Sequence, residues 1–356
     1  MKKKSVAILS LILALAIIMV GCSNKNNKEG KDTPAVSENQ NGANNSQETG
    51  DSNDKLDDYV VRLTYTGSLC QAPLQLAYEL GYFDEEGVKV EFIKSEQAAA
   101  DLMVSGKLDV YQDMIPKIVQ QVDNGLNIKI VSGVHTGCLK ALTLATNDEI
   151  NSIKDLKGKK IGVPGLASSQ AVIVQRTLLE YGIGATPDNM EVEFVVYNAS
   201  DLQMALENGY VDAICIADPA ASKIVESGVG KLIFDQSSDP LYEDEYCCVL
   251  VFSPEFIEKH PEIAKKTLKA IQKACIFVEE NPEEAAKLQI EKNYVAGDVE
   301  LNSRLLKSYN YNPSIEGAKD SVYKNVVALQ KLGLISNDLS PEAVLDKIFY
   351  EIEGIE

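Results

Sequence analysis

The sequence predicts an α/β protein built from two similar lobes. Three observations lead to this fold class: the chain has 356 residues, strands alternate with helices along most of it, and one order of strand, loop and helix occurs twice. Single cores stop growing at about 250 to 300 residues, so this length favours two lobes. Alternation of strands and helices favours parallel sheets with right-handed crossovers.

The repeated pattern begins with an apolar strand and a loop of small polar residues. In the first copy the strand covers 61–65, and the helix after the loop ends before Gly81. In the second copy the strand covers 160–163, and the corresponding helix ends before Gly182. Glycine is the expected residue after a last helical turn, because it adopts the left-handed conformation at little cost.

The two copies stay similar further along the chain. The segments GKLDV at 106–110 and GYVDA at 209–213 each place a short buried strand after a glycine. Both copies then end in another apolar strand, at 128–131 and at 232–234. The repeat therefore extends over a whole α/β unit, which indicates two lobes of one design.

Two further apolar segments, 135–148 and 246–252, are predicted to connect the lobes as a hinge. The first lobe is predicted to comprise 59–138 and 247–356, and the second lobe 139–246. The chain after the second connection is predicted to be helical and to pack mainly on the first lobe. A separate C-terminal helical domain is the alternative.

The N-terminal segment resembles a secretory signal peptide, predicted for residues 1–21. Three lysines open it, and residues 6–20 are apolar except for one serine. The apolar run is shorter than the roughly 20 residues that span a bilayer, which disfavours the alternative of a transmembrane helix. The segment ends in Met-Val-Gly-Cys, which resembles a bacterial lipobox and makes Cys22 the predicted site of lipidation.

Residues 22–58 are predicted to be a disordered tether, because they are polar and contain no aromatic residue before Tyr59. With Cys22 lipidated, the protein is predicted to be a monomer anchored to the outer face of the bacterial cytoplasmic membrane. The formal net charge of −19 disfavours nucleic acid as a partner, because phosphates repel an acidic chain.

Six cysteines follow the tether: Cys70, Cys138, Cys215, Cys247, Cys248 and Cys275. Their spacings match no zinc motif, since two adjacent cysteines cannot form a Cys-x-x-Cys hook. Export permits disulfides, and the sequence leaves their pairing open. Four of the six lie at or near strand ends or crossings, which leaves a soft-metal or redox site as an alternative. Buried free thiols are the preferred interpretation, and no metal or cofactor is predicted.

The candidate ligand contacts lie where predicted strands end and helices begin. In open α/β sheets ligands bind beyond the carboxyl ends of strands, where free N–H groups of helix starts favour polar or anionic groups. The predicted ligand-binding residues are Ser68, Leu69, Cys70, Gln71, Gln112, Asp113, His135, Thr136, Ser168, Ser169, Gln170, Asn198 and Asp218. Helix capping is the alternative role for Ser168, Asp113 and Asp218.

An enzyme is not predicted. The chain has no G-x-x-x-x-G-K, G-x-S-x-G or H-E-x-x-H motif and contains only two histidines. No catalytic residues are therefore assigned.

Several segments resemble the lipid-anchored substrate-binding proteins of bacterial ABC transporters for nitrate, sulfonates and taurine, a family closely similar to binders of thiamine-precursor pyrimidines. The matching segments are APLQLAYELGYFDEEGVKVEF, GKLDV, IKDLKGKKIGVPG and SPEFIEKHPEIAKKTLKAI. The resemblance implies a periplasmic-binding-protein-like fold of type II. It also implies hinge closure on a solute and its delivery to a permease driven by a cytoplasmic ATPase. It places ligand contacts on 68–71, 112–113, 168–170 and Asp218.

The sequence departs from this family at Ala217, where relatives often have a tryptophan; the chain contains none. The predicted function is capture of a small polar solute such as nitrate, a sulfonate or taurine. A binder of a thiamine-precursor pyrimidine, or a related pyrimidine synthase, is the alternative. The synthase would need a cysteine-rich motif around a histidine, of which Cys247 and Cys248 give the one hint.

Overall fold

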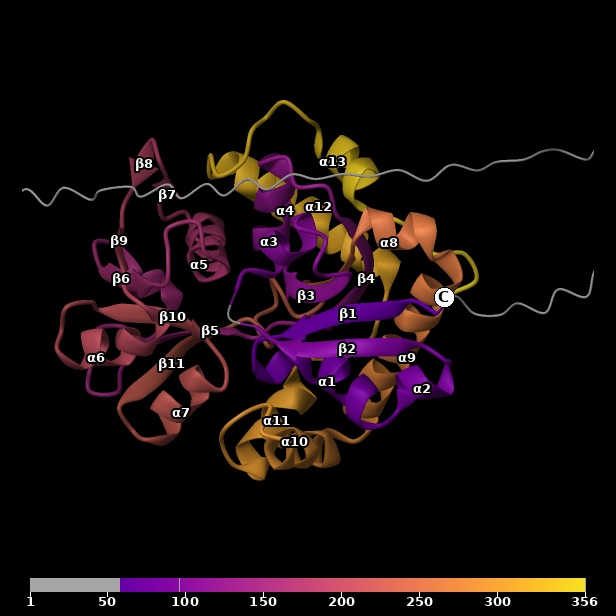
Figure 1. Ribbon diagram of the computed structural model, residues 1–356. Helices are drawn as coiled ribbons and strands as arrows, with labels where there is room; N and C mark the ends of the chain where they lie inside the picture. Colours follow the sequence, from indigo (N-terminus) through magenta and orange to yellow (C-terminus); the bar gives the residue numbers. More distant parts are fainter. Residues whose placement is uncertain (1–57, 96, 356) are drawn as a thin grey trace, which may run out of the picture. The chain divides into compact units, whose positions relative to one another are not determined.

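The computed structural model describes residues 58–95 and 97–355. The predicted signal peptide, the lipidation site Cys22 and the tether up to residue 57 lie outside the described residues. All described residues belong to one compact unit. Within it the strands form two five-stranded sheets and one short hairpin, with helices packed around them (Figure 1).

The first sheet, sheet A, has the strand order β2-β1-β3-β12-β4. These strands are β1 (Val60–Tyr65), β2 (Lys89–Lys94), β3 (Val110–Met114), β4 (Lys129–Thr136) and β12 (Tyr246–Phe252). β1 is parallel to β2 and β3, whereas β12 is antiparallel to both β3 and β4. A strand from far along the chain therefore separates β3 from β4.

The second sheet, sheet B, has the order β11-β5-β10-β6-β9. Its strands are β5 (Leu139–Leu144), β6 (Lys160–Val163), β9 (Glu193–Val196), β10 (Ala213–Ala217) and β11 (Gly230–Asp235). β6, β9 and β10 are parallel, and β5 is antiparallel to β10 and β11. The short hairpin consists of β7 (Ala185–Thr186) and β8 (Asn189–Met190).

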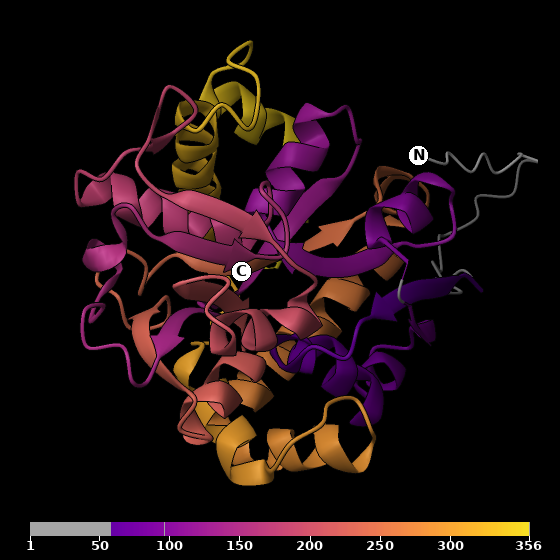
Figure 2. The ribbon, with the colours of Figure 1, turned by 90° about the vertical axis from the view of Figure 1, so that its left-hand side faces the viewer.

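The two sheets share one plan. In each, three parallel strands are followed by an antiparallel strand, β12 in sheet A and β5 in sheet B, and then by a last strand. The strands expected from the repeated sequence pattern occupy equivalent places in the two sheets. The predicted α/β fold with two parallel-rich sheets is therefore confirmed. Figure 2 shows the side formed by sheet B and its helices.

The helices between the strands cover the sheets. Those along sheet A are η1 (Leu69–Gln71), α1 (Ala72–Glu79), α2 (Tyr82–Glu85), α3 (Ala99–Val104) and α4 (Ile115–Asp123). Those along sheet B are η2 (Ile153–Leu156), α5 (Ser169–Glu180), η3 (Ala199–Asp201), α6 (Leu202–Glu207) and α7 (Ala220–Glu226). Prolines in the first turns of α1 and α4 cost nothing there, because those N–H groups have no helical partner.

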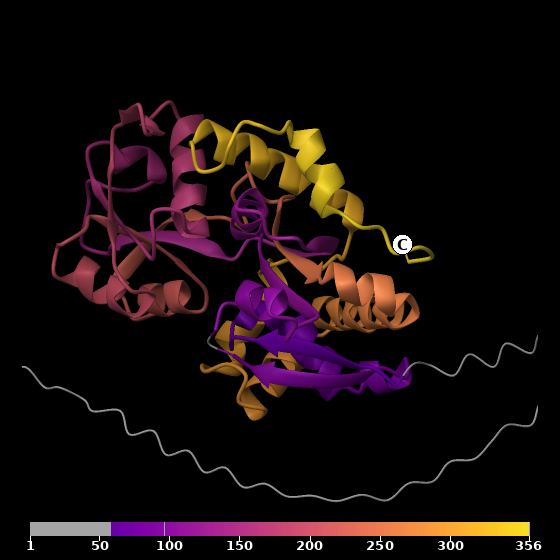
Figure 3. The same cartoon turned by 45° about the horizontal axis from the view of Figure 1, so that its top comes forward.

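The chain after β12 is helical, as expected. It forms α8 (Pro254–Lys259), α9 (Pro261–Glu280), α10 (Pro282–Glu291), α11 (Val299–Ser308), α12 (Ile315–Lys331) and α13 (Pro341–Ile348). α9 packs on α1 and α2, and α12 packs on α4, β4 and β12, all of them elements of the sheet A side. Figure 3 also shows α12 beside α5 of the sheet B side. The predicted lobe boundaries at 138/139 and 246/247 stay a prediction.

Burial explains why the central strand is continuously apolar. All seven residues of β12 are buried, because the strand has neighbours on both edges and helices over its faces. The edge strand β2 instead alternates between exposed and half-buried residues. Among the helices of the described residues, none combines the length and the apolar composition that a membrane span needs.

Candidate ligand-binding site

The loop between β1 and η1 is held by its own side chains. Gly67 has a φ of +78°, and an added Cβ would lie 3.0 Å from the carbonyl oxygen of Tyr294, so glycine is required here. Gln71 Oε1 accepts hydrogen bonds from the Thr66 N–H, at 2.9 Å, and from the Thr66 hydroxyl, at 3.1 Å. The amide oxygen of Gln71 is thus used within the loop.

The residue after this turn, Cys70, is fixed from three directions. Its carbonyl oxygen accepts a 3.0 Å hydrogen bond from Gln112 Nε2 of β3 and a 3.4 Å bond from the Tyr311 hydroxyl. Its Sγ lies 3.4 Å from Ser68 Oγ. The preceding Leu69 is fully buried in the hydrophobic core.

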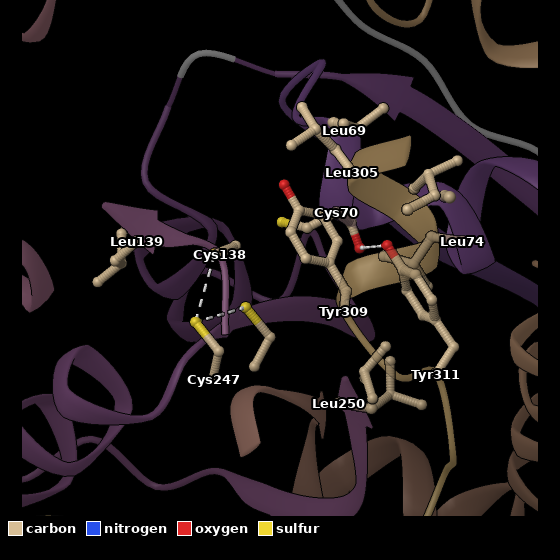
Figure 4. Close-up of a cluster of buried hydrophobic side chains, with 14 of the residues drawn as sticks. Leu69, Cys70, Leu74, Cys138, Leu139, Cys247, Leu250, Leu305, Tyr309 and Tyr311 are labelled. Carbon is tan, nitrogen blue, oxygen red and sulfur yellow. Dashed lines mark hydrogen bonds between the residues drawn. The ribbon is translucent and has the colours of Figure 1, made fainter. Parts of the chain in front are cut away.

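Four cysteines and one histidine meet at this point: Cys70, His135, Cys138, Cys247 and Cys248, called here the cysteine–histidine cluster. Cys138 Sγ lies 3.3 Å from Cys247 Sγ, and Cys247 Sγ lies 3.9 Å from Cys248 Sγ (Figure 4). All five residues are at least nine-tenths buried. They come from η1, the end of β4, the link from β4 to β5, and the start of β12.

An irregularity in β12 brings its two adjacent cysteines together. Tyr246 pairs with Thr136 and Cys248 pairs with His135, so two residues of β12 stand against one of β4 and the extra residue is Cys247. Successive side chains of a regular strand point to opposite faces, and a bulge redirects them. The spacing argument against a metal site therefore does not hold for Cys247 and Cys248.

Hydrogen bonding within the cluster raises the pKa of two of its thiols, Cys138 and Cys248, and lowers that of the other two. The neighbouring Cys138, and then Cys248, lower the pKa of Cys70 and of Cys247 well below the usual thiol range. Cys215 lies elsewhere in the core, where burial raises its pKa.

Polar atoms without partners surround the cluster. Gln112 Oε1, His135 Nε2, Gln236 Oε1 and the Tyr309 hydroxyl are buried and accept or donate no hydrogen bond within the described part of the chain. Burial raises the pKa of Tyr309 well above its ordinary value, so its hydroxyl stays protonated. Buried polar groups are nearly always paired, and these four therefore indicate a missing partner such as a ligand.

A narrow cavity of about 10 Å³ lies beside the cluster. Met114 and Pro116 line it from the sheet A side, Ser169 and Ile173 from α5 of the sheet B side, and Cys247 from β12. This volume is about that of one water molecule. Elements of the two sheets are thus closed on each other around the site.

Direct contacts join the two sides. Arg176 of α5 binds Glu245 and Asn325, Gln120 Nε2 of α4 donates to the Ala167 carbonyl at 3.0 Å, and Arg304 of α11 forms an ion pair with Glu226 of α7. The sheet A and sheet B sides are therefore in direct contact in this structure.

Several predicted ligand contacts act as caps or ion-pair partners. Ser168 Oγ accepts from the Ala171 N–H at 3.2 Å and caps α5. Asp113 accepts from the Met114 N–H at 2.9 Å and pairs with Lys117 at 2.7 Å. Ser168 therefore acts as a helix cap, which is the alternative role stated for it above. Asp113 instead pairs with its neighbours in the chain.

Asp218 and Asn198 differ in their surroundings. Asp218 is buried, accepts from Ser222 and pairs with Lys140 at 2.8 Å, and its N–H donates to the Cys138 carbonyl at 3.1 Å, which places it beside the cluster. Asn198 is exposed and donates to Asp201 at 3.1 Å. Asn198 therefore lies apart from the buried polar atoms.

The remaining predicted residues divide in the same way. Thr136 is buried, and its hydroxyl donates to the Tyr309 carbonyl at 2.8 Å. Ser169 lines the cavity, and Gln170 is half-buried at the start of α5. The structure thus brings Cys70, Gln112 and His135 together, and places Ser169 at the cavity beside the cluster.

Sequence reasoning missed Tyr309, Tyr311 and Gln236 as site residues. The two tyrosines follow α11, and their ring centres lie 5.6 and 5.2 Å from that of His135. Nothing in the local pattern around them signals a site, because they reach it through tertiary packing more than 170 residues away from His135. Gln236 directly follows β11, and the ends of strands could have signalled it.

Comparison with known proteins gives the family. A sequence model described as NMT1/THI5 like matches residues 70–285, which is more than half of the chain. The chain belongs to the NMT1/THI5-like family. The resemblance inferred from the sequence is thereby confirmed.

Relatives of this NMT1/THI5-like chain include proteins with two kinds of name. A Bacillus subtilis protein named for binding aliphatic sulfonates is 28% identical over 225 residues, covering 61% of this chain and 65% of the relative. The chain thus spans slightly less than two thirds of that relative's length. A 4-amino-5-hydroxymethyl-2-methylpyrimidine phosphate synthase of Aspergillus parasiticus is 25% identical over 291 residues, covering 76% and 81%.

A solved structure has the same fold. The periplasmic aliphatic sulphonate binding protein SsuA from Escherichia coli superposes with a TM-score of 0.67 at 15% identity, covering 82% of this chain and 98% of SsuA. The periplasmic-binding-protein-like fold of this NMT1/THI5-like chain is therefore shown. A shared fold does not identify the solute, because function depends on the residues of the site.

Proposed function

We propose that this chain is the extracytoplasmic solute-binding component of an ABC importer. In this proposal it captures a small polar solute between the sheet A and sheet B sides by closure of the hinge, and delivers it to a permease driven by an ATPase. Lipid on Cys22 would hold it at the outer face of the bacterial cytoplasmic membrane.

The observation that carries this proposal is the set of unpartnered polar atoms beside the cysteine–histidine cluster, of which Gln236 also lines the cavity. Gln112 belongs to sheet A, Gln236 follows the last strand of sheet B, and Tyr309 directly follows α11. A buried, unsatisfied polar atom costs about 1 to 3 kcal/mol. A solute that satisfied several of these atoms at once would repay that cost in the closed state and favour closure.

The charges near the site favour a solute that is not a simple anion. Lys140 is a buried cation near the site, but it is shared between Asp218, at 2.8 Å, and Asp235, at 3.1 Å, so these three side chains carry a net negative charge. A zwitterion such as taurine, with an ammonium and a sulfonate group, suits this balance better than nitrate does. The sulfonate would then rely on amide and hydroxyl donors.

A thiamine-precursor pyrimidine is the second candidate solute. The rings of His135, Tyr309 and Tyr311 lie within 6.3 Å of one another, measured between centres. Such rings offer faces for a planar heterocycle to stack on. The Aspergillus parasiticus relative named as a pyrimidine phosphate synthase supports the same choice.

The test is a thermal-shift and calorimetric titration of the full chain. Taurine, ethanesulfonate, nitrate and 4-amino-5-hydroxymethyl-2-methylpyrimidine are the probes. A solute present at 100 times its dissociation constant stabilises the folded state by about 2.7 kcal/mol, which raises the melting temperature. One of the four probes should raise the melting temperature, and the protein should show no covalent change after binding it.

The matched variants are Gln112→Ala with Gln236→Ala, and Gln203→Ala as the control on the exposed face of α6. The affinity of the double variant for the solute should be at least tenfold lower than that of the wild type. The control should bind the solute as the wild type does. A panel without any stabilising solute, or an unchanged response in the double variant, overturns the proposal.

A further inference from the structure

We propose that the cysteine–histidine cluster binds one thiophilic d¹⁰ metal ion, Zn²⁺ or Cu⁺, beside the solute cavity. The site is distinct from solute capture and does not rest on it. Imidazole and thiolate are the protein ligands that such ions prefer.

The spacing of the donor atoms fits one ion. Cys70, His135 and Cys248 form one set whose donor atoms all lie within 4.8 Å of one another, and Cys138, Cys247 and Cys248 form a second. Sulfur atoms of a tetrahedral zinc site with bonds of about 2.3 Å are about 3.8 Å apart. The observed sulfur distances of 3.3 and 3.9 Å bracket this value. The two sets share Cys248, and the first of them contains His135.

The histidine supplies an independent observation. Its Nδ1 lies 2.5 Å from the carbonyl oxygen of Thr136, which can only accept a hydrogen bond. Nδ1 is therefore protonated, which leaves Nε2 as the nitrogen that can bind an ion. Nε2 is fully buried and makes no hydrogen bond of regular geometry in the part of the chain described, and the His135 ring interacts with the Cys70 side chain. A carbonyl that orients an imidazole in this way is the usual support of a metal-binding histidine.

The other buried cysteines show what an ordinary core position looks like. Cys215 and Cys275 are buried too, and neither belongs to a group of donor atoms in the described residues that could hold an ion. Cysteine as a small apolar residue explains these two. It does not explain four thiols and one imidazole gathered in two overlapping sets of donor atoms.

The apolar surroundings set the expected ligand number. Leu139 and Leu250 pack around the cluster, so a high net charge would be costly there (Figure 4). Each cysteine that binds gives up its thiol proton. Zinc takes four ligands, fewer than the five donors available. We therefore expect His135 and three of the thiols to bind zinc, and fewer thiols to bind Cu⁺.

The position of the site gives the ion a structural role. Its ligands belong to the η1 loop, to the end of β4 with the first crossing, and to the start of β12 after the second crossing. One ion would tie these three segments together next to the cavity that Cys247 lines.

The first experiment measures metal content. The full chain is purified with a phosphine reductant and without chelators, and is then titrated anaerobically with Zn²⁺ or Cu⁺. About one ion per chain is expected by elemental analysis. Titration with Co²⁺ as a spectroscopic probe should give thiolate-to-cobalt charge-transfer absorption. X-ray absorption of the loaded wild type should show sulfur and nitrogen ligands together, which needs no variant.

Two double variants separate the site from general thiol chemistry. Cys247→Ser with Cys248→Ser should lower affinity for the ion at least 100-fold, and His135→Asn should remove the nitrogen ligand from the absorption spectrum. Cys215→Ser with Cys275→Ser, which changes two equally buried cysteines, should keep one ion per chain.

Three results would overturn the metal site. They are a wild type that takes up no ion, unchanged binding in the Cys247/Cys248 double variant, and a Cys138–Cys247 disulfide that re-forms in preference to metal after reduction. Solute binding by the metal-free chain would leave the proposed function intact and is measured separately with the thermal-shift panel. The two proposals therefore fail independently.

Discussion

The Arg176 guanidinium and the Glu245 carboxylate form a two-pronged ion pair, with distances of 2.6 Å from Nη1 to Oε1 and 2.9 Å from Nη2 to Oε2. Asn325 of α12 completes the group by donating to Glu245 Oε1 at 2.9 Å. Arg176 lies on α5 beside sheet B, and α12 packs on sheet A. This group therefore joins the two sides of the structure.

Glu245→Gln should strongly destabilise the protein. The Arg176 side chain is 12% exposed, so it would remain a buried charge without its counter-charge. Breaking a buried pair from one side costs about 3 to 5 kcal/mol. Urea unfolding of the full chain measures the loss, and Glu243→Gln, on a neighbouring exposed glutamate, is the control. A loss as small as that of the control would show that the pair is dispensable.

Tyr309→Phe should stabilise the solute-free protein and weaken solute binding. The Tyr309 hydroxyl is buried without a partner in the described residues. Its removal should therefore raise the free energy of unfolding by about 1 to 3 kcal/mol. The same change removes a hydroxyl offered to the solute, and affinity should fall about tenfold.

The control for Tyr309 is Tyr311→Phe, whose hydroxyl contacts the Cys70 carbonyl at 3.4 Å. This variant should lose up to about 1 kcal/mol of stability, because a hydrogen bond is removed. Differential scanning calorimetry with and without solute measures both effects. Lower stability in Tyr309→Phe would mean that its hydroxyl has a partner within the protein.

Tyr242 should make the protein less stable at high pH. Burial raises the pKa of Tyr242 to about 12, whereas an exposed tyrosine ionises near pH 10. Between these values the folded state binds more protons than the unfolded state, so stability falls as pH rises through this window. Tyr242→Phe should reduce that fall by up to about 2 to 3 kcal/mol.

Urea unfolding from about pH 8 to pH 11.5 measures this dependence. Tyr323→Phe, which changes an exposed tyrosine of α12, should leave the pH profile unchanged. Identical profiles for Tyr242→Phe and the wild type would contradict the assignment. Tyr242→Phe should also lose about 1 kcal/mol at neutral pH, because the hydroxyl lies 3.0 Å from Thr177 Oγ1.

Gly137→Ala should destabilise the first crossing. An added Cβ would lie 2.6 Å from the Gln236 carbonyl carbon and 2.6 Å from the Ser237 nitrogen, which are backbone atoms and cannot turn aside. Overpacking of this kind costs about 1 to 3 kcal/mol. The control is Gly165→Ala, where the nearest atom is 3.9 Å away. Equal melting temperatures for the two variants would show that the crossing adjusts freely.

The sequence predicted the strands well because their signals are local. The repeated order of apolar strand, loop and glycine-terminated helix gave matching strands in both sheets, and a continuous apolar run gave β12. The order of the strands within each sheet could not be predicted from the sequence pattern. Nothing near residues 246–252 states that this strand pairs with both β3 and β4.

The site was predicted only where it depends on the ends of strands. Cys70, Gln112 and His135 meet as the strand-end argument expects, whereas Tyr309 enters through the packing of C-terminal helices. Cys248 joins the cluster through a bulge, which depends on the register of β12 and not on its composition. Capping and ligand contact remained indistinguishable for Ser168, because one residue type serves both roles.

The place of β12 dictates an assembly order. β3 and β4 follow each other in the chain, but in sheet A each of them pairs with β12. Until residue 252 has been synthesised, the backbone groups of β3 and β4 that pair with β12 therefore have no partner strand. The five strands of sheet B lie within one unbroken stretch, 139–235, and can pair earlier. The half of the molecule that is made first is therefore the half that is finished last, and a nascent chain shorter than 246 residues carries two bare strand edges open to aggregation.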